Sequence, residues 1–250
     1  GSFAGSAQVT LVSSGAGTTE APDAALGQAA VPVTGRVYAP AVAEVVTPVV
    51  NFGIVRVGDV VATRQVSLGN AANGALSDSL HATLAGGAAP FAAGGSAVVA
   101  AGGLDETNLG VTLSTAQAGL FNSTATLSLS SHNADLADLG LGESTVLLQA
   151  QVNQLAEAGL ALAGGTASLA GGAAAYTLNF GTLALGGGSL SATLNLSNLT
   201  LGTADALAGS WDLTGAGPGS GFMLSGFDSF AGLAAGDRKS TRLNSSHDQI

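Results

Sequence analysis

Short segments of the chain alternate apolar and polar residues with a period of two, the pattern of strands that bury one face. The alternation is clearest over residues 109–113, 124–129 and 145–152. We predict a strand over each range, with its apolar side in a core. The core residues expected from these ranges are Leu109, Val111, Leu113, Ala125, Leu127, Leu129, Val146, Leu148, Ala150 and Val152.

Clusters of Gly, Asn and Asp separate the alternating segments, as at residues 69–74 and 131–135. These residue types favour turns because they tolerate left-handed backbone or hydrogen-bond to it. Many short strands with turns between them predict an all-β fold of β-sandwich type. Residues 152–162 are left open, either as a short helix or as a link between two units.

Two parts of the chain repeat each other. Asn51-Phe52-Gly53 recurs as Asn179-Phe180-Gly181. In both copies a second Asn, at the end of an alternating segment, follows 19 residues after the first, at Asn70 and at Asn198. We expect Phe52 and Phe180 to lie at equivalent places in two cores, where the following Gly lets the chain leave the strand.

A second similarity links the start of the chain to its middle. Residues 3–11 parallel residues 121–129, and residues 31–37 parallel residues 146–152. The start of the chain therefore matches the last two strands of a unit.

The two similarities together predict tandem repeats. Residues 1–38 are the trailing half of a first unit, residues 45–153 a complete unit, and residues 170–236 the leading part of a third. The expected partners of each unit are thus its neighbours in the same chain.

The last residues, 237–250, differ abruptly from the rest and contain the single Lys, Lys239. From Asp237 to His247 they resemble the translation of a common short-read sequencing adapter. We expect a non-native tail and exclude it from the fold reasoning. The alternative is a native basic C-terminus.

Composition narrows the class of protein. Charged residues make up 9 % of the chain, against about 25 % in ordinary soluble domains, and the net charge is −10. An apolar fraction of 46 % and a mean hydropathy of +0.45 argue against disorder. Phosphate binding needs a basic face, so nucleic acid is excluded as a partner. The uncharged stretch 158–204 is interrupted too often by polar residues to predict a membrane span.

One segment carries a family resemblance: Val49-x-x-Phe52-Gly53-x-Val55-x-Val57-Gly58, followed by Arg64-x-Val66-x-Leu68-x-Asn70. It resembles the immunoglobulin-like domains of the choice-of-anchor D and hydin-related group. The third unit departs from the pattern, with Leu190 and Ser191 near the expected Arg. The resemblance implies tandem immunoglobulin-like domains of a bacterial secreted or cell-surface protein.

Motifs of catalysis are missing from the sequence. A P-loop ends in a Lys that the chain lacks before residue 239, and His81 and His132 lie too far apart for an H-E-x-x-H zinc motif. Gly217–Gly221 places Pro inside what would be a nucleophile elbow. Members of a catalytic triad meet only in space, so the sequence leaves that arrangement open. We expect no enzyme and no cofactor.

Calcium is the one metal for which the sequence offers candidates, because Ca²⁺ binds carboxylate and carbonyl oxygens. The candidate ligands are Asp105 with Glu106, and Asp135 with Asp138. The alternative is that these are solvated loop acids. We expect His81 and His132 to be surface hydrogen-bonding residues.

These observations favour a non-catalytic structural or adhesive region of an extracellular or cell-surface bacterial protein, with a cell-surface or matrix ligand as a further partner. The alternative is a ligand- or carbohydrate-binding module attached to an enzyme outside this fragment. That alternative needs exposed aromatic residues, and we expect Tyr38, Tyr176 and Trp211 to be too few and too buried. Trp211 is predicted to begin a strand and to fill the third core.

Overall fold

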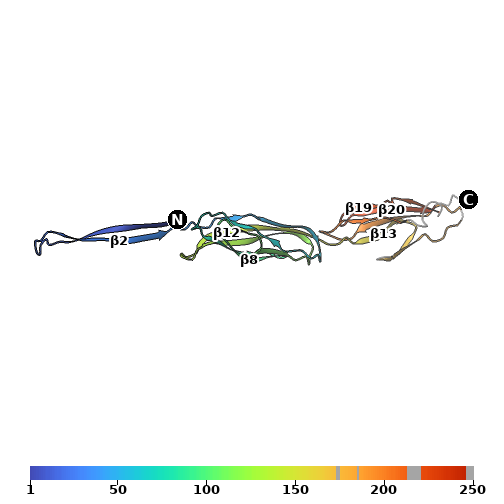
Figure 1. Ribbon diagram of the computed structural model, residues 1–250. Coiled ribbons are helices and arrows are strands. Elements are labelled where there is room, and N and C mark those ends of the chain that lie inside the picture. The colour runs from blue at the N-terminus through green and yellow to red at the C-terminus, as the bar shows by residue number, and fades with distance from the viewer. Residues whose placement is uncertain (173–174, 185, 213–220, 246–250) are drawn as a thin grey trace. The chain divides into compact units, whose positions relative to one another are not determined.

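The computed structural model describes residues 1–172, 175–184, 186–212 and 221–245, and all regular structure in these residues is β-strand (Figure 1). The all-β prediction is therefore confirmed. No helix forms over residues 152–162, which belong to the ends of two strands and the segment between them. The chain divides into two compact units.

The first unit comprises Gly1–Val50, Thr63–Thr112 and Thr124–Leu147. Strands β1 to β12 form a two-stranded sheet β1-β2, a seven-stranded sheet in the order β4-β12-β11-β7-β8-β10-β5, and a three-stranded sheet β3-β6-β9. Of these strands, β4, β10, β11 and β12 have residues in both units. The strands are β1 (Ser2–Ser13), β2 (Ala24–Arg36), β3 (Ala43–Val45), β4 (Val49–Arg56), β5 (Arg64–Gln65), β6 (Leu68–Asn70), β7 (Ser79–Gly86), β8 (Phe91–Val99), β9 (Leu104–Asp105), β10 (Leu109–Leu113), β11 (Gly119–His132) and β12 (Leu139–Asn153).

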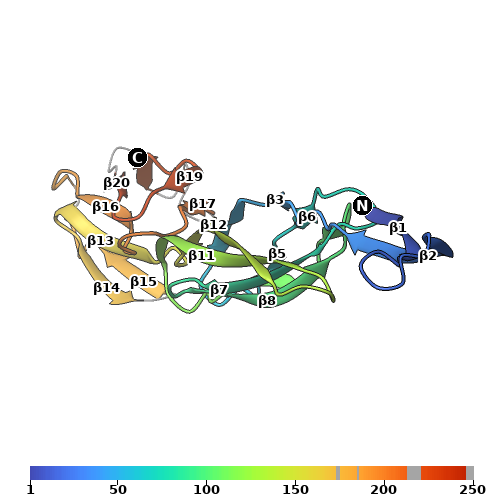
Figure 2. The same ribbon diagram turned by 90° about the vertical axis from the view of Figure 1, so that its left-hand side faces the viewer.

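The central core follows the predicted alternation. Along β12, Val146, Leu148 and Val152 are fully buried, and β11 buries Leu127 in the same way. Figure 2 shows β11 beside β7 and β7 beside β8, the antiparallel neighbours that the strand register defines. The predicted residues Leu109, Val111, Leu113, Ala125 and Ala150 are also buried, and Leu129 is half-buried. Period-two alternation therefore identified the core side of these strands.

Strands β1 and β2 pair over their full lengths, yet no residue of either strand is buried. The register places Ala7 opposite Val31 and Gly5 opposite Val33, so one face of the hairpin gathers the apolar side chains. Phe3, Val9, Leu11, Val31 and Val33 lie on that face and are all exposed. The hairpin therefore has the alternating pattern of a sheet that buries one face, but its apolar face is exposed to solvent.

The second unit comprises Asn51–Ala62, Leu113–Ser123 and Leu148–Ile250. Its C-terminal part forms a four-stranded sheet in the order β13-β16-β20-β18 and the pairs β14-β15 and β17-β19. These strands are β13 (Ala158–Gly165), β14 (Ser168–Gly172), β15 (Ala175–Asn179), β16 (Ser191–Asn198), β17 (Leu207–Gly209), β18 (Phe222–Ser225), β19 (Phe230–Leu233) and β20 (Arg238–Ser245). Several sheets of this kind are consistent with a β-sandwich.

The segment that the sequence sets apart as a tail forms β20, which pairs with both β16 and β18. Its origin stays a prediction from the sequence. Trp211 is half-buried against Phe227, with ring centroids 4.9 Å apart, but it lies outside any strand, contrary to expectation. Residues 213–220, with most of Gly217–Gly221, and residues 246–250, with His247, lie outside the described residues.

Candidate functional site

Two histidines that lie far apart in the sequence meet on the seven-stranded sheet. His81 in β7 stands opposite Ser130 in β11, and His132 stands opposite Ser79. His81 and His132 are therefore diagonal neighbours on one face, because side chains two residues apart on a strand point the same way. Their rings stack with centroids 4.4 Å apart and planes inclined by 28°. The sequence predicted two surface hydrogen-bonding residues and gave no sign that their rings meet.

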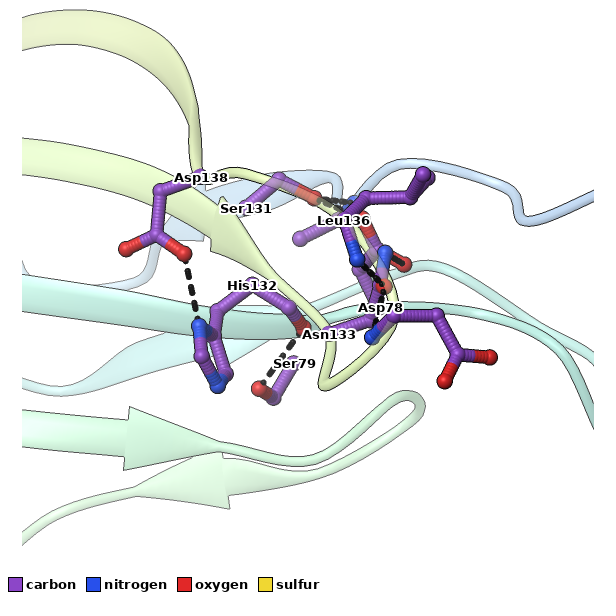
Figure 3. A network of polar contacts seen from close by, with 9 residues as sticks. Asp78, Ser79, Ser131, His132, Asn133, Leu136 and Asp138 are labelled. Carbon is purple, nitrogen blue, oxygen red and sulfur yellow. Dashed lines mark hydrogen bonds and ion pairs between the residues drawn. The ribbon is translucent and has the colours of Figure 1, made fainter.

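Asp138 completes a cluster with the two rings. Its Oδ1 lies 2.6 Å from Nδ1 of His132, and Figure 3 shows the carboxylate pointing at that ring. The His132 side chain is 41 % exposed and that of Asp138 is 52 % exposed, so the cluster is open to solvent. A ring nitrogen bonded to a carboxylate carries the proton in neutral imidazole, which leaves Nε2 with a free lone pair. We call His81, His132 and Asp138 the histidine cluster.

A buried carboxylate lies next to this cluster and holds the loop between β11 and β12. Asp78 is 7 % exposed and accepts hydrogen bonds from Ser131 Oγ at 2.7 Å and from Asn133 Nδ2 at 2.8 Å (Figure 3). The other end of the Asn133 amide, Oδ1, accepts from the backbone N of Asp135 and Leu136. Both carboxylate oxygens are thus bonded, as a buried charge requires, and Asp78 fixes the loop that carries Asp138.

The structure gives the calcium candidates in this loop separate partners. Asp135 accepts hydrogen bonds from the Tyr38 hydroxyl and from Arg36 Nη1, whereas Asp138 contacts His132. The Tyr38 hydrogen bond, and after it Arg36, holds the pKa of Asp135 below its ordinary value. The same hydrogen bond raises the pKa of Tyr38, because ionised tyrosine would face a carboxylate.

The other calcium candidates lie near β9. Asp105 accepts a hydrogen bond from the backbone N of Asn108 at 3.2 Å, and a second from its side-chain amide. Glu106 is exposed. The local role of Asp105 is to close a turn, and calcium binding at either pair of acids stays a prediction.

The two Asn residues that mark the sequence repeat are both buried and hydrogen-bonded to several backbone groups. Asn70 is 1 % exposed and makes four hydrogen bonds. Its Oδ1 accepts from the backbone N of Val42 and Ala72, at 3.0 and 3.2 Å. Its Nδ2 donates to the carbonyl oxygens of Asp78 and Val99, at 3.0 and 3.2 Å. One amide thereby ties together three separate segments of the first unit.

Asn198 has the same arrangement in the second unit and is also 1 % exposed. Its Oδ1 accepts from the backbone N of Glu157 and Thr200, at 3.2 and 3.3 Å. Its Nδ2 donates to the carbonyl oxygens of Asp205 and Leu233, at 3.1 and 3.2 Å. The sequence marked both residues as equivalent but contained no sign that either is buried.

Further local features repeat at the same spacing. Oδ1 of Asn51 accepts from the N of Gly53, and Oδ1 of Asn179 accepts from the N of Gly181, both at 2.8 Å. The two glycines have φ of 74° and 75°, left-handed backbone in which a Cβ is strained. Phe52 is buried, whereas Phe180 is half-buried against Phe222, so the expected equivalence of the two rings holds only in part.

A second carboxylate in the second unit has structural partners as well. Asp205 accepts from Asn153 Nδ2 at 3.0 Å and is paired with Arg56 Nε. The Asn153 hydrogen bond, followed by the Arg56 pair, lowers the pKa of Asp205 from its ordinary value of 3.8. The lowered pKa favours the ionised carboxylate, which is the form that pairs with Arg56.

Comparison with known proteins adds no function. No family model matches the chain, and no curated protein matches it. A solved structure of a protein of unknown function from Porphyromonas gingivalis W83 is similar, with a TM-score of 0.31 and 10 % sequence identity over 82 % of this chain and 83 % of that one. A similarity at this level carries no argument here.

In the part of the chain that the structure describes, no helix has the length and apolar character needed to cross a membrane.

Proposed function

We propose that the chain is a non-catalytic structural or adhesive region of a bacterial secreted or cell-surface protein, built from tandem immunoglobulin-like β-sandwich units. The observation that carries this proposal is the repeated hydrogen-bond pattern around Asn70 and Asn198. In a protein built from tandem repeats each unit has the same local structure, which accounts for the same buried amide in both places.

The entry into each repeat supports the same view. Ala39 and Ser77 form an isolated parallel β-bridge, and so do Gln154 and Ala204. In each case the bridge lies three residues before the backbone N that donates to the buried Asn, at Val42 and at Glu157. Asn153 ends β12, the last strand of the predicted complete unit, and Gln154 follows it directly. The second copy of this entry segment therefore begins directly after β12.

Three carboxylates of the described residues have contacts that hold the fold together. Asp78, Asp135 and Asp205 are each bonded by side chains that fix loops or strand ends. A hollow of the first unit is lined by Gly1, Ser2, Val37–Ala39 and Asn73–Ser77, whose side chains include no carboxylate, imidazole or thiol. In a spacer of this kind, any binding function resides in variable loops or strand edges.

The carbohydrate-binding alternative gains nothing from the aromatic side chains. Tyr38 is half-buried and bonded to Asp135, and Trp211 packs against Phe227. The exposed aromatic residues among those described, Phe3, Tyr176 and Phe222, come from three different sheets and form no shared platform in the strand pairing. The arrangement of the aromatic side chains therefore favours the structural or adhesive function over carbohydrate binding.

The location can be tested on the bacterium that encodes the protein. Antibodies raised against residues 39–153 are expected to label intact cells or the culture medium, and the epitope should disappear when intact cells are treated with protease. A cytoplasmic protein of the same cells serves as the control for lysis. Labelling only after lysis would contradict the proposal.

A further inference from the structure

We propose that the histidine cluster, His81, His132 and Asp138, is a binding site for a divalent transition-metal ion, with Zn²⁺ as the best fit. Nothing in the proposed structural function requires this site, and the two can fail separately. The inference rests on the donor set, the positions of the donors and the way the fold holds them.

The donors are those that zinc prefers. Two imidazole nitrogens and one carboxylate oxygen are a common protein ligand set for Zn²⁺, with water in the fourth position. The ligand atoms of His81, His132 and Asp138 all lie within 4.8 Å of one another. Two donors about 2.0–2.1 Å from a tetrahedral ion stand roughly 3.4 Å apart. Small side-chain rotations would therefore close the site.

The backbone under both rings is well fixed. His81 follows Leu80, which is fully buried, and His132 follows Ser131, whose hydroxyl joins the buried carboxylate of Asp78. Ser79 Oγ also donates to the carbonyl oxygen of His132, at 3.1 Å. Only the side chains of the two histidines would need to move on their strands, and ligands on strands are positioned more precisely than ligands on loops.

Asp138 has two ways to serve the ion. Its carboxylate can bind the metal directly, or it can keep its contact with Nδ1 of His132 and present the Nε2 lone pair to the metal. Carboxylates that orient a ligating imidazole in this second way are typical of zinc sites. In both cases the carboxylate contributes negative charge to a cation site in a chain whose net charge is −10.

The donor set separates this proposal from the calcium expectation. Calcium takes six to eight oxygen ligands, and two imidazole nitrogens contribute none. The nearby acid Asp135 is occupied by Arg36 and Tyr38, so it adds no oxygen to the cluster. Of the three histidines in the chain, the two in the described residues are the two that stack.

The test is a titration of the full chain with Zn²⁺ at pH 7.5, with bound metal measured by equilibrium dialysis. One equivalent is expected to bind to the wild type and to His247→Gln, which changes the third histidine and serves as the matched control. His81→Gln and His132→Gln should each weaken binding at least tenfold, and Asp138→Asn about tenfold. Circular dichroism without metal checks that every variant folds like the wild type.

A second readout avoids reliance on stoichiometry. Zn²⁺ should raise the melting temperature of the wild type and of His247→Gln, because an ion that binds the folded state stabilises it, and should leave His81→Gln unchanged. Millimolar Ca²⁺ should not displace the zinc. The proposal is overturned if the wild type binds no zinc, if His81→Gln and His132→Gln bind it as tightly as the wild type, or if Ca²⁺ competes equally.

Discussion

The two hairpins β1-β2 and β11-β12 have the same residue pattern but different surroundings. Residues 3–11 parallel 121–129, and residues 31–37 parallel 146–152. In the second hairpin Leu127 and Val146 are fully buried, whereas the matching Val9 and Val31 are 43 % and 51 % exposed. The alternation therefore decides which residues share a face, and it leaves open whether that face is covered.

The cover comes from other strands. In the seven-stranded sheet, β12 lies next to β4 and β11 lies next to β7, so the hairpin is continued on both sides. Strands β1 and β2 form a sheet of their own. Because a hairpin alone is marginally stable in water, the free energy of burial is gained only where these further strands are present.

The largest expected effect is a cavity mutation in the covered hairpin. Leu127→Ala should destabilise the central core by about 3 kcal/mol, because it removes buried methyl groups and leaves a cavity. Its counterpart Val9→Ala should cost less than about 0.5 kcal/mol, as exposed sites generally do. Urea denaturation of both variants measures the difference, and equal losses would show that β1-β2 is buried in solution.

Removing the buried amides should have the next largest effect. Asn70→Ala and Asn198→Ala each leave buried backbone groups without partners, at a cost of about 2–3 kcal/mol. Asn73→Ala is the control, since Asn73 is exposed and bonds only locally to Ala71. Chemical denaturation should give both Asn70→Ala and Asn198→Ala a clearly lower free energy of unfolding than Asn73→Ala. An effect at one Asn alone would argue against their equivalence.

A smaller effect is expected at the paired glycines. Gly53→Ala and Gly181→Ala put a Cβ on left-handed backbone, which costs about 1–2 kcal/mol. Neither site has another atom within 4 Å of the added Cβ, so the loss reports backbone strain alone. Gly5→Ala, at ordinary φ with equally open space, should be neutral in the same denaturation assay. A neutral Gly53→Ala would contradict the left-handed turn.

The smallest effect concerns pH. The pKa of Asp205 is lowered in the folded state, so its contribution is present above 3.8 and is lost as pH falls through the lower folded value. Asp205→Asn should therefore flatten the acid side of the stability curve between about pH 5 and pH 2, as followed by thermal melts. Asn153→Ala should weaken the same dependence. If Asp205→Asn shows the same loss of stability at acid pH as the wild type, Asp205 does not contribute to that loss.

The sequence was informative where the determinant is local. Alternation located the core residues of β10, β11 and β12, and the Asn-x-Gly turns at Asn51 and Asn179 were visible as a repeat. Burial of Asn70 was not visible, because two of its four partners, Val42 and Val99, lie almost 30 residues away in the sequence. The histidine cluster was missed for the same reason, since the register of β7 against β11 brings His81 to His132 and no local pattern encodes that register.

The most direct test of the repeat account is single-molecule stretching of the whole chain. If the chain is built of repeats, the units that contain Asn70 and Asn198 should unfold in separate events. Asn70→Ala should lower the force of one event and Asn198→Ala the force of the other. A single event that both variants weaken would contradict the account, because the two amides would then belong to one cooperative domain.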